Sequence, residues 1–442
     1  MDNTTTHRGN QNQFTADSRN VQREVKSNIH KELLNRLDLS FLDQLSRPQL
    51  DAQIGQIARE IMDELQVRLN SLERAEVIKQ VQDEVSGLGP IESLVADPTI
   101  SDILVNTWRE VYVERYGRLS LTDVQFQNDG HLMGIIDKIT STIGRRVDES
   151  SPMVDARLKD GSRVNVVIPP AAVDGPIMSI RKFRADPLTL ENLTATRSLS
   201  PPMFEFLKAA VIARANILIS GGTGSGKTTL LNALSRFIAD DERVITIEDS
   251  AELQLQGKHV VRLETRPANI EGEGEIYQGD LLKNALRMRP DRIIVGEVRG
   301  GEALDMLQAM NTGHDGSMTT IHANSPRDAL TRLEHMVAMS GVPIPALVIR
   351  QQVVAALHIL VDAERLADGR RVVTSIQEIT GMELETVEMQ EIFNFEKSGV
   401  DANGMIVGRF TATGIVPQIN ELLIRSGVAL DNSVYNPEKA YE

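Results

Sequence analysis

Apolar residues recur at helical spacing between residues 26 and 86. They form three stripes, whose members are Leu33, Leu34 and Leu37, then Ile54, Ile57, Ile61, Leu65, Leu69 and Leu72, and then Val77, Val81 and Val85. Pro48 interrupts the pattern between the first two stripes, as a helix breaker does. The spacing predicts a bundle of amphipathic helices, which either pack only on one another or offer one face to a partner helix.

Residues 1–25 differ from this pattern because they are rich in Asn, Gln, Thr and Arg and poor in large apolar side chains. A segment of this composition buries too little apolar surface to offset the entropy lost on ordering. We therefore predict a disordered tail, and we expect no secretory signal in it.

The helical pattern ends at Gly87-Leu88-Gly89-Pro90, a sequence typical of a boundary. Beyond it, runs of alternating apolar and polar positions predict strands, and one helical pattern predicts a helix. The predicted strands are 103–106, 111–114, 164–168 and 177–183, and the predicted helix is 131–144. We interpret residues 87–184 as an α/β domain. Residues 185–200 show little periodicity and are predicted to be an interdomain linker.

Strands alternate with helical segments from residue 201 onward. The predicted strands are 217–219, 244–247, 260–263, 292–295 and 317–321. Strands separated by helices predict a mainly parallel, doubly wound sheet, so residues 201–442 are interpreted as a second α/β domain. Near its end, Asn403-Gly404 lies between two apolar runs and predicts a hairpin.

A glycine-rich segment follows the predicted strand 217–219 and precedes a helical pattern at 230–238. It has the spacing G-x-x-x-x-G-K-[ST], and the residues expected to contact nucleotide are Gly222, Thr223, Gly224, Ser225, Gly226, Lys227, Thr228 and Thr229. Glycines let backbone N–H groups curl around a phosphate, and the helix N-terminus adds a positive dipole end. We expect Lys227 to reach the β- and γ-phosphates and the Thr228 hydroxyl to bind Mg²⁺. The segment predicts a nucleoside triphosphate site.

Hydrolysis needs a carboxylate to orient the attacking water in addition to this loop. Glu297, the pair Glu248 and Asp249, and His322 each follow a predicted strand. The carboxyl ends of parallel strands meet at one edge of a sheet, so we expect these side chains near the loop, with Asp249 organising Mg²⁺. Gly296 stands where many phosphate-loop enzymes carry a metal-binding aspartate. The alternatives are solvated strand ends, an acidic first turn of a helix and a structural histidine.

Charge and composition narrow the classes of function. The chain has 442 residues, a formal net charge of −15 and no cysteine. The acidic balance disfavours a protein whose main task is to grip nucleic acid, and the lack of cysteine excludes disulfides and cysteine-ligated zinc. The apolar stretches fall far short of the roughly 20 residues that cross a bilayer. Any membrane association is therefore expected to be peripheral and mediated by partners.

Seven motifs together resemble the secretion-superfamily ATPases, which power pilus assembly and type II or type IV secretion. The motifs are GLGPIE at 87–92, GRRVDESSPMVDARL at 144–158, DGSRVN at 160–165, GGTGSGKTT at 221–229, IED at 247–249, RPDRIIVGEVRG at 289–300 and TTIHAN at 319–324. Within this GspE- and PilB-like superfamily, the chain is most similar to the CpaF/TadA branch of Tad (Flp) pili. The lack of cysteine departs from the type II members, many of which carry a four-cysteine zinc module.

The resemblance implies roles for the candidate residues. Glu248 and Asp249 match the Asp box of the family, Glu297 matches its atypical Walker B glutamate, and His322 matches its His box. These are the residues reached above from strand ends alone.

The resemblance also implies an architecture. A RecA-like ATPase core follows a smaller, PAS-like α/β domain and the helical bundle, and six copies form a homohexameric ring that binds ATP and Mg²⁺. Arg163 and Arg181 lie where related ATPases carry arginines from the N-terminal domain toward the nucleotide. The implied partners are integral membrane platform proteins, met at the cytoplasmic face of the bacterial inner membrane.

The function implied is a motor for assembly of a Tad/Flp-type pilus, with or without retraction, or for related protein secretion. The alternative within the superfamily is a DNA-translocating type IV secretion ATPase. A third class is a nucleotide switch, in which hydrolysis only times partner binding. The acidic balance and an aromatic content of 4% disfavour direct binding of nucleic acid.

Overall fold

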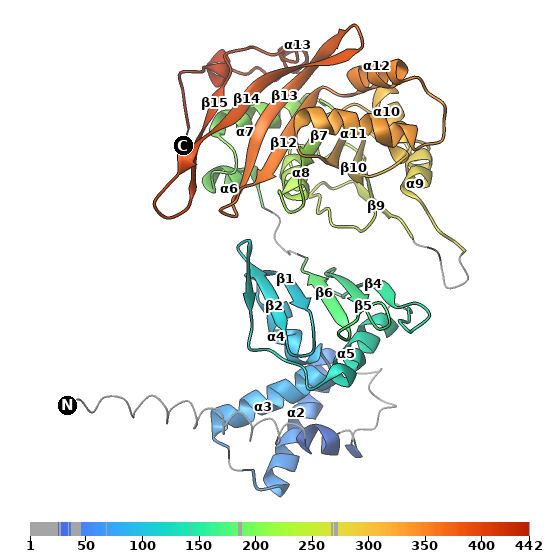
Figure 1. Cartoon of the computed structure of the whole chain (residues 1–442), viewed down its shortest axis with the longest axis vertical. Coiled ribbons are helices and arrows are strands. Elements are labelled where there is room, and N and C mark those ends of the chain that lie inside the picture. Colours follow the sequence, from blue (N-terminus) through green and yellow to red (C-terminus); the bar gives the residue numbers. More distant parts are fainter. Residues whose placement is uncertain are drawn as a thin grey trace, which may run out of the picture. The chain divides into compact units, whose positions relative to one another are not determined.

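The computed structural model describes residue 25 and residues 28–33, 35–36, 46–67, 69–142, 144–183, 188–266, 268 and 273–441. The predicted tail (apart from residue 25), Leu34, Leu37 and residues 185–187 of the predicted linker lie outside the described residues. The chain divides into two compact units, residues 1–184 and 185–442, and each is described by itself (Figure 1).

Helices α2 (Arg47–Glu64) and α3 (Ser71–Val85) pack through apolar side chains in the first unit. Their shared core contains Ile29, Leu33, Ile54, Ala58, Ile61, Met62, Val77, Ile78 and Val81. The second predicted stripe runs too far, since Leu72 is 81% exposed. Asn70 accepts the N–H of Glu73, and the Glu73 carboxylate accepts the N–H of Asn70, so a capping box starts a new helix.

A six-stranded sheet forms the rest of the first unit, in the order β3-β2-β1-β6-β5-β4 with every neighbouring pair antiparallel. The strands are β1 Ile100–Val105, β2 Val111–Arg115, β3 Arg118–Leu121, β4 Met153–Arg157, β5 Arg163–Val167 and β6 Ile177–Arg181. Strands β3 and β4 were not predicted. Strand β3 is exposed throughout and β4 buries only Val154, so neither contributes a row of buried apolar side chains to the core.

Helix α4 (Glu92–Ala96) and helix α5 (Asp129–Ser141) pack on this sheet through a common apolar core. The Lys138 ammonium on α5 donates to the carbonyl oxygens of Val85 at 2.8 Å and Gly87 at 2.7 Å. This lysine caps the end of α3, so the helical part and the sheet part of the first unit are joined at the GLGP boundary.

The second unit is built on a nine-stranded mixed sheet in the order β15-β14-β13-β12-β7-β11-β10-β8-β9. Strands β7, β11, β10, β8 and β9 are parallel, as the alternating pattern predicted. Strand β12, which was not predicted, is also parallel to β7, whereas β13, β14 and β15 extend the sheet antiparallel. The strands are β7 Ile217–Gly221, β8 Val244–Glu248, β9 Val260–Glu264, β10 Arg292–Val298, β11 Met318–His322, β12 Ile359–Arg365, β13 Arg371–Glu383, β14 Thr386–Val400 and β15 Ile406–Ala412.

The predicted hairpin at Asn403-Gly404 is confirmed as the β14–β15 turn, in which Gly404 has φ +79°. The preceding hairpin, β13–β14, was missed because its turn consists of Leu384 and Glu385. Leu384 adopts φ +53° without the glycine or asparagine that usually signals such a turn.

Helices cover both faces of this sheet (Figure 1). Ile217 and Ile219 of β7 face one layer and Leu218 faces the other, as the alternation of a strand requires. The first layer contains α6 Leu190–Ala195, α7 Pro201–Ile212 and α8 Lys227–Ser235, and the second contains α9 Gln278–Ala285, α10 Glu302–Asn311, α11 Pro326–Ala338 and α12 Ala346–Ala356. Helix α6 lies inside the predicted linker, so this part of 185–200 belongs to the core of the second unit. In the described ranges, no helix has the length and apolar character needed to cross a membrane.

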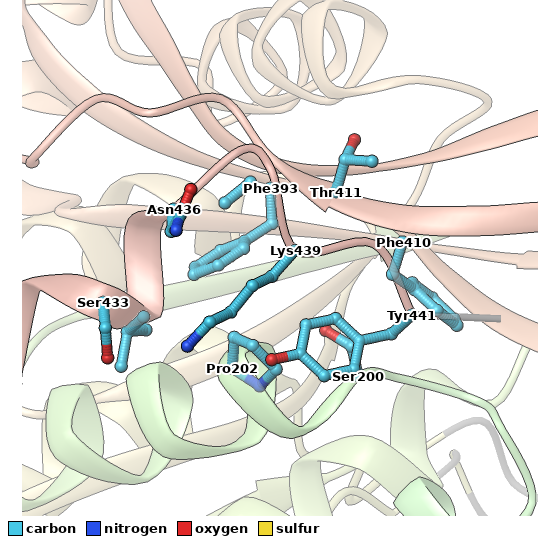
Figure 2. Close-up of a pocket in the computed structure, with 11 residues that line it drawn as sticks. Ser200, Pro202, Phe393, Phe410, Thr411, Ser433, Asn436, Lys439 and Tyr441 are labelled. Atoms are coloured by element: carbon cyan, nitrogen blue, oxygen red, sulfur yellow. The ribbon is translucent and has the colours of Figure 1, made fainter.

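The last described residues, after α13 (Asn420–Arg425), return to the sheet edge. Tyr441 and Phe410 of β15 exchange backbone hydrogen bonds of 2.7 and 3.1 Å. Figure 2 shows the side chains of Lys439 and Tyr441 over a small pocket that Phe393 also lines. The lining of this pocket contains no acidic residue and no part of the glycine-rich segment, so it is not the candidate site.

A buried arginine supports the start of β10. Arg292 is 1% exposed, and its guanidinium makes two 2.7 Å bonds to the Glu242 carboxylate and one 2.8 Å bond to the Val211 carbonyl of α7. Removing one partner of such a pair leaves the other charge buried and uncompensated.

We expect Arg292→Met to destabilise the second unit by about 3 kcal/mol, the cost of breaking a buried ion pair. Hydrogen exchange of the β10 amides measures this opening free energy. The matched control is Arg425→Ala, which removes the exposed pair with Glu421 and should change stability by less than about 0.5 kcal/mol. Equal effects of the two variants would contradict a structural role for the buried pair.

Candidate nucleotide-binding site

The glycine-rich segment leaves the centre of the parallel sheet. Gly221 ends β7 and pairs with His322 of β11 on one side and with Ala363 of β12 on the other. It has φ +150°, and a Cβ there would collide with the Ala363 carbonyl oxygen. Only glycine allows the chain to turn away from the sheet at this point without separating the two strands.

The loop that follows leads directly into helix α8. Gly226 has φ +97° and forms the N-cap of α8, so the first N–H groups of that helix face the loop. The Lys227 ammonium donates to the carbonyl oxygens of Gly221 at 2.8 Å and Gly222 at 2.9 Å. The Ser225 hydroxyl is buried and makes no hydrogen bond within the described chain. These features are suited to binding the phosphates of a nucleotide.

The parallel strands bring the predicted polar residues to the same edge. His322 ends β11, Glu297 lies near the end of β10, and Glu248 ends β8, with Asp249 directly after it. These strands are successive neighbours of β7. By contrast, His314 precedes β11 and therefore lies at the opposite edge, where its ring contacts the Ala309 carbonyl at 3.1 Å.

A bulge aims the Glu297 side chain. Between Val295 and Val298 the pairing of β10 with β11 shifts register, so β10 carries an extra residue at Gly296-Glu297. The Glu297 carboxylate accepts two bonds from the Arg299 guanidinium, at 2.6 and 2.9 Å, and its side chain is 23% exposed. It is therefore held at the rim, where solvent water can reach it.

Glu248 occupies the space above Gly296. A Cβ on Gly296 would lie 3.0 Å from the Glu248 Cγ, which is tighter than ordinary contact. The absent aspartate thus has a physical explanation, because the carboxylate of the neighbouring strand fills its place. Glu248 Oε1 accepts the N–H groups of Glu252 and Leu253 at 2.8 Å, while its buried Oε2 has no partner in the described chain. Burial raises the pKa of Glu248 to about 7, against its ordinary value of 4.5.

Arg299 links the two acidic positions of the site. Besides Glu297, its guanidinium lies 3.2 Å from the Asp249 carboxylate, whose side chain is 40% exposed. Its bridging position depends on the pairing of β10 with β8, which brings Glu297 and Asp249 together. No local signal identified it.

The residues present fit ATP and Mg²⁺. In the part of the chain that the structure describes, no three acidic or histidine side chains converge as a metal site. Magnesium does not require one, because it is usually held by one or two protein oxygens, phosphate oxygens and waters. The Thr228 hydroxyl at the start of α8 and the carboxylate of Asp249 or Glu248 can supply those protein oxygens, and the unpartnered Oε2 of Glu248 is suited to such a contact.

Arginines also gather on the first unit's sheet. Arg157, Arg163 and Arg181 are direct cross-strand partners on β4, β5 and β6, and Asp102 on β1 continues the row. Like charges directly opposite one another are unfavourable in a sheet. The row includes both predicted arginines and adds Arg157.

The fold and the loop define a phosphate-loop ATPase. A family model for "Type II/IV secretion system protein" matches residues 84–416. The chain therefore belongs to the type II/IV secretion system ATPases and is an ATP hydrolase.

Several relatives are named for conjugation or type IV secretion. A putative conjugal transfer protein of Mycobacterium tuberculosis is 37% identical over 300 residues, covering 66% of this chain and 85% of that protein. The conjugal transfer protein TrbB of Rhizobium radiobacter is 35% identical over 280 residues, covering 62% and 83%. The type IV secretion system protein VirB11 of Bartonella quintana is 31% identical over 326 residues, covering 65% and 91%.

Solved structures give a weaker likeness. The VirB11 ATPase of Brucella suis, in complex with sulphate, is 30% identical, covers 65% of this chain and 95% of its own, and has a TM-score of 0.36. The pilus retraction motor PilT with bound ADP is 19% identical, covers 76% and 86%, and has a TM-score of 0.49. At these TM-scores neither structure positions any residue of this chain.

We expect Glu248→Gln to stabilise the nucleotide-free chain increasingly as pH rises. Because the folded pKa of about 7 exceeds the ordinary 4.5, protonated Glu248 favours the fold at low pH, and this contribution is lost as pH rises through that window. Between about pH 5 and about pH 8, the variant should gain about 2 kcal/mol relative to the unmodified chain. Denaturant unfolding at both pH values measures the gain. Glu264→Gln, at the exposed cross-strand neighbour on β9, should show no such gain.

We expect Arg299→Ala to lower the Mg²⁺ concentration that gives half-maximal ATPase rate. Removing the guanidinium frees Asp249 and Glu297 from an ion pair that Mg²⁺ must otherwise displace, an effect of about fivefold for a contact of ~1 kcal/mol. Arg287→Ala, an exposed arginine elsewhere, is the control. An unchanged Mg²⁺ dependence would show that Arg299 does not compete with the metal.

Proposed function

We propose that the chain is the motor ATPase of a type IV secretion machine, and that hydrolysis occurs at the edge formed by β7, β11, β10 and β8. The supporting observation is the convergence of the Lys227 loop with Glu297, Glu248 and Asp249 on neighbouring parallel strands. A loop alone binds nucleotide, whereas a loop with a strand-end carboxylate is equipped to hydrolyse it.

Each residue has a distinct role in this proposal. The loop backbone and Lys227 bind the phosphates, while Thr228 and Asp249 hold Mg²⁺. Glu297 orients the attacking water and takes its proton, which fits its position at the solvent-facing rim. Glu248 supports the metal and its waters from below, and His322, beside Gly221, senses the γ-phosphate.

We further propose that the second unit is a RecA-like core and that the sheet of the first unit is a PAS-like domain that contributes Arg163 and Arg181. Support for this assignment comes from the motifs at 144–158 and 160–165 and from the direct cross-strand pairing of Arg163 with Arg181.

We assign the working form as a homohexamer at the cytoplasmic face of the inner membrane, acting on integral membrane platform proteins. The names of the relatives support conjugal transfer or type IV secretion better than the Tad/Flp pilus reading. The net charge of −15 favours a motor that moves protein components over one that grips DNA. A Tad/Flp pilus motor is the second candidate, supported by the motifs between residues 87 and 324.

We expect Glu297→Gln to lower kcat by about 100-fold or more, the usual contribution of a general base, with little change in ATP affinity. Lys227→Ala should instead lose ATP binding. Phosphate release and equilibrium binding of ATP separate the two effects, and Glu396→Gln on β14, whose carboxylate pairs with Arg409, is the control. Full activity of the Glu297 variant would contradict the assigned site.

The machine is identified in cells that carry only the Glu297→Gln chain. Conjugal DNA transfer, protein secretion and surface pili are scored separately. Loss of transfer or secretion supports the type IV assignment, whereas loss of pili alone moves it to the Tad/Flp motor. Normal output in all three assays favours a nucleotide switch. Salt-sensitive stimulation of the ATPase by single-stranded DNA would favour the DNA translocase.

A further inference from the structure

The bulge in β10 makes the backbone beside the site irregular. Two residues of β10, Gly296 and Glu297, lie opposite a single residue of β11, Thr320, because the register shifts between Val295 and Val298. A bulge interrupts the regular ladder of backbone hydrogen bonds and bends the strand locally. The direction of the Glu297 side chain therefore depends on the groups that hold the backbone of these two residues.

Thr320 holds the first residue of the bulge. Its side chain is buried, and its hydroxyl donates to the Gly296 carbonyl oxygen at 2.7 Å. From the side of β8, Glu248 confines the same residue, since a Cβ on Gly296 would lie 3.0 Å from the Glu248 Cγ. A hydrogen bond shielded from water is stronger than an exposed one, so Gly296 is held in place between its two neighbouring strands.

Gln278 holds the second residue of the bulge. It is the first residue of α9 and is buried, and its side-chain amide donates to the Glu297 carbonyl oxygen at 3.1 Å. Helix α9 belongs to the second helical layer, whereas Thr320 lies on the same face of β11 as Met318, which packs in the first layer. The bulge is thus bonded from both faces of the sheet.

These two bonds act on the residue assigned to activate water. A general base works only within hydrogen-bond reach of the proton that it takes, and a displacement of about 1 Å can lower a rate about 100-fold. We propose that Thr320 and Gln278 are positioning residues for hydrolysis, which fix the bulge in the conformation that aims Glu297 at the attacking water. The inference rests on the proposed role of Glu297 as the general base.

The test compares kcat of the full chain with its equilibrium affinity for ATP. Thr320→Val keeps the shape of the side chain and removes the hydroxyl, so kcat should fall about tenfold or more while ATP affinity is unchanged. Thr320→Ser keeps a hydroxyl and should restore most of the rate. The matched control is Thr319→Val, because Thr319 is equally buried on β11 and its hydroxyl contacts the Thr320 carbonyl within its own strand.

The second residue is tested in the same way. Gln278→Met removes the amide at similar length and should lower kcat about fivefold, the equivalent of one neutral hydrogen bond. Asn284→Met, at an exposed position of α9, is its control and should leave kcat unchanged. Because Gln278 lies on a different element, this variant keeps the inference testable if Thr320→Val fails to fold.

A double variant separates positioning from a general loss of structure. If Thr320 acts only through Glu297, adding Thr320→Val to Glu297→Gln leaves the residual rate of that variant unchanged. A purely structural role would lower the rate by the same factor in both backgrounds, which would overturn the inference.

The remaining outcomes are also distinguishable. Normal kcat in Thr320→Val or in Gln278→Met overturns the role of that residue, and so does an equal loss in its control variant. A loss of ATP affinity as large as the loss of kcat would assign the residue to nucleotide binding and overturn its positioning role. Full activity of Glu297→Gln would show that the proposed hydrolytic site is itself wrong. An inactive Glu297→Gln with normal rates in both positioning variants overturns the positioning inference alone.

Discussion

The close parallel pairing of β7 with β11 and β12 is the constraint on which the candidate site depends. Gly221 passes so near the Ala363 carbonyl that no side chain fits there. Parallel hydrogen bonding then sets the carboxyl ends of all neighbouring strands at one edge. His322 is one strand from the loop, and Glu297 is two strands from it. A shift of this pairing would displace every functional side chain together.

Acidic and basic side chains at this edge of the sheet come from different strands. Carboxylates come from β10 and β8, and guanidinium groups come from β12 and β13, with the loop between them. This division suits a nucleoside triphosphate. Its phosphates are negatively charged, and Mg²⁺ and the attacking water lie at its γ-phosphate. Arg299 is the exception, since it lies among the carboxylates and forms ion pairs with Glu297 and Asp249. We propose that Mg²⁺ competes with Arg299 for these carboxylates.

Most parallel strands of the second unit could be predicted, because buried strands such as β7 and β10 are short apolar runs bounded by turn residues. The errors have physical causes. The prediction of one apolar stripe from Ile54 to Leu72 was wrong because a capping box at Asn70 starts a separate helix. The β13–β14 hairpin was hidden because Leu384 adopts a left-handed conformation that the sequence pattern does not mark.

The sequence by itself determined the phosphate loop, the acidic residues that follow the strands and the resemblance to secretion ATPases, because these are properties of neighbouring residues. Only the tertiary structure decided that Glu248 fills the space above Gly296, that a bulge aims Glu297, and that Thr320 lies opposite that bulge. Each of these depends on the register between strands distant in the chain. Register is set by backbone pairing and burial across the whole sheet, which no local pattern contains.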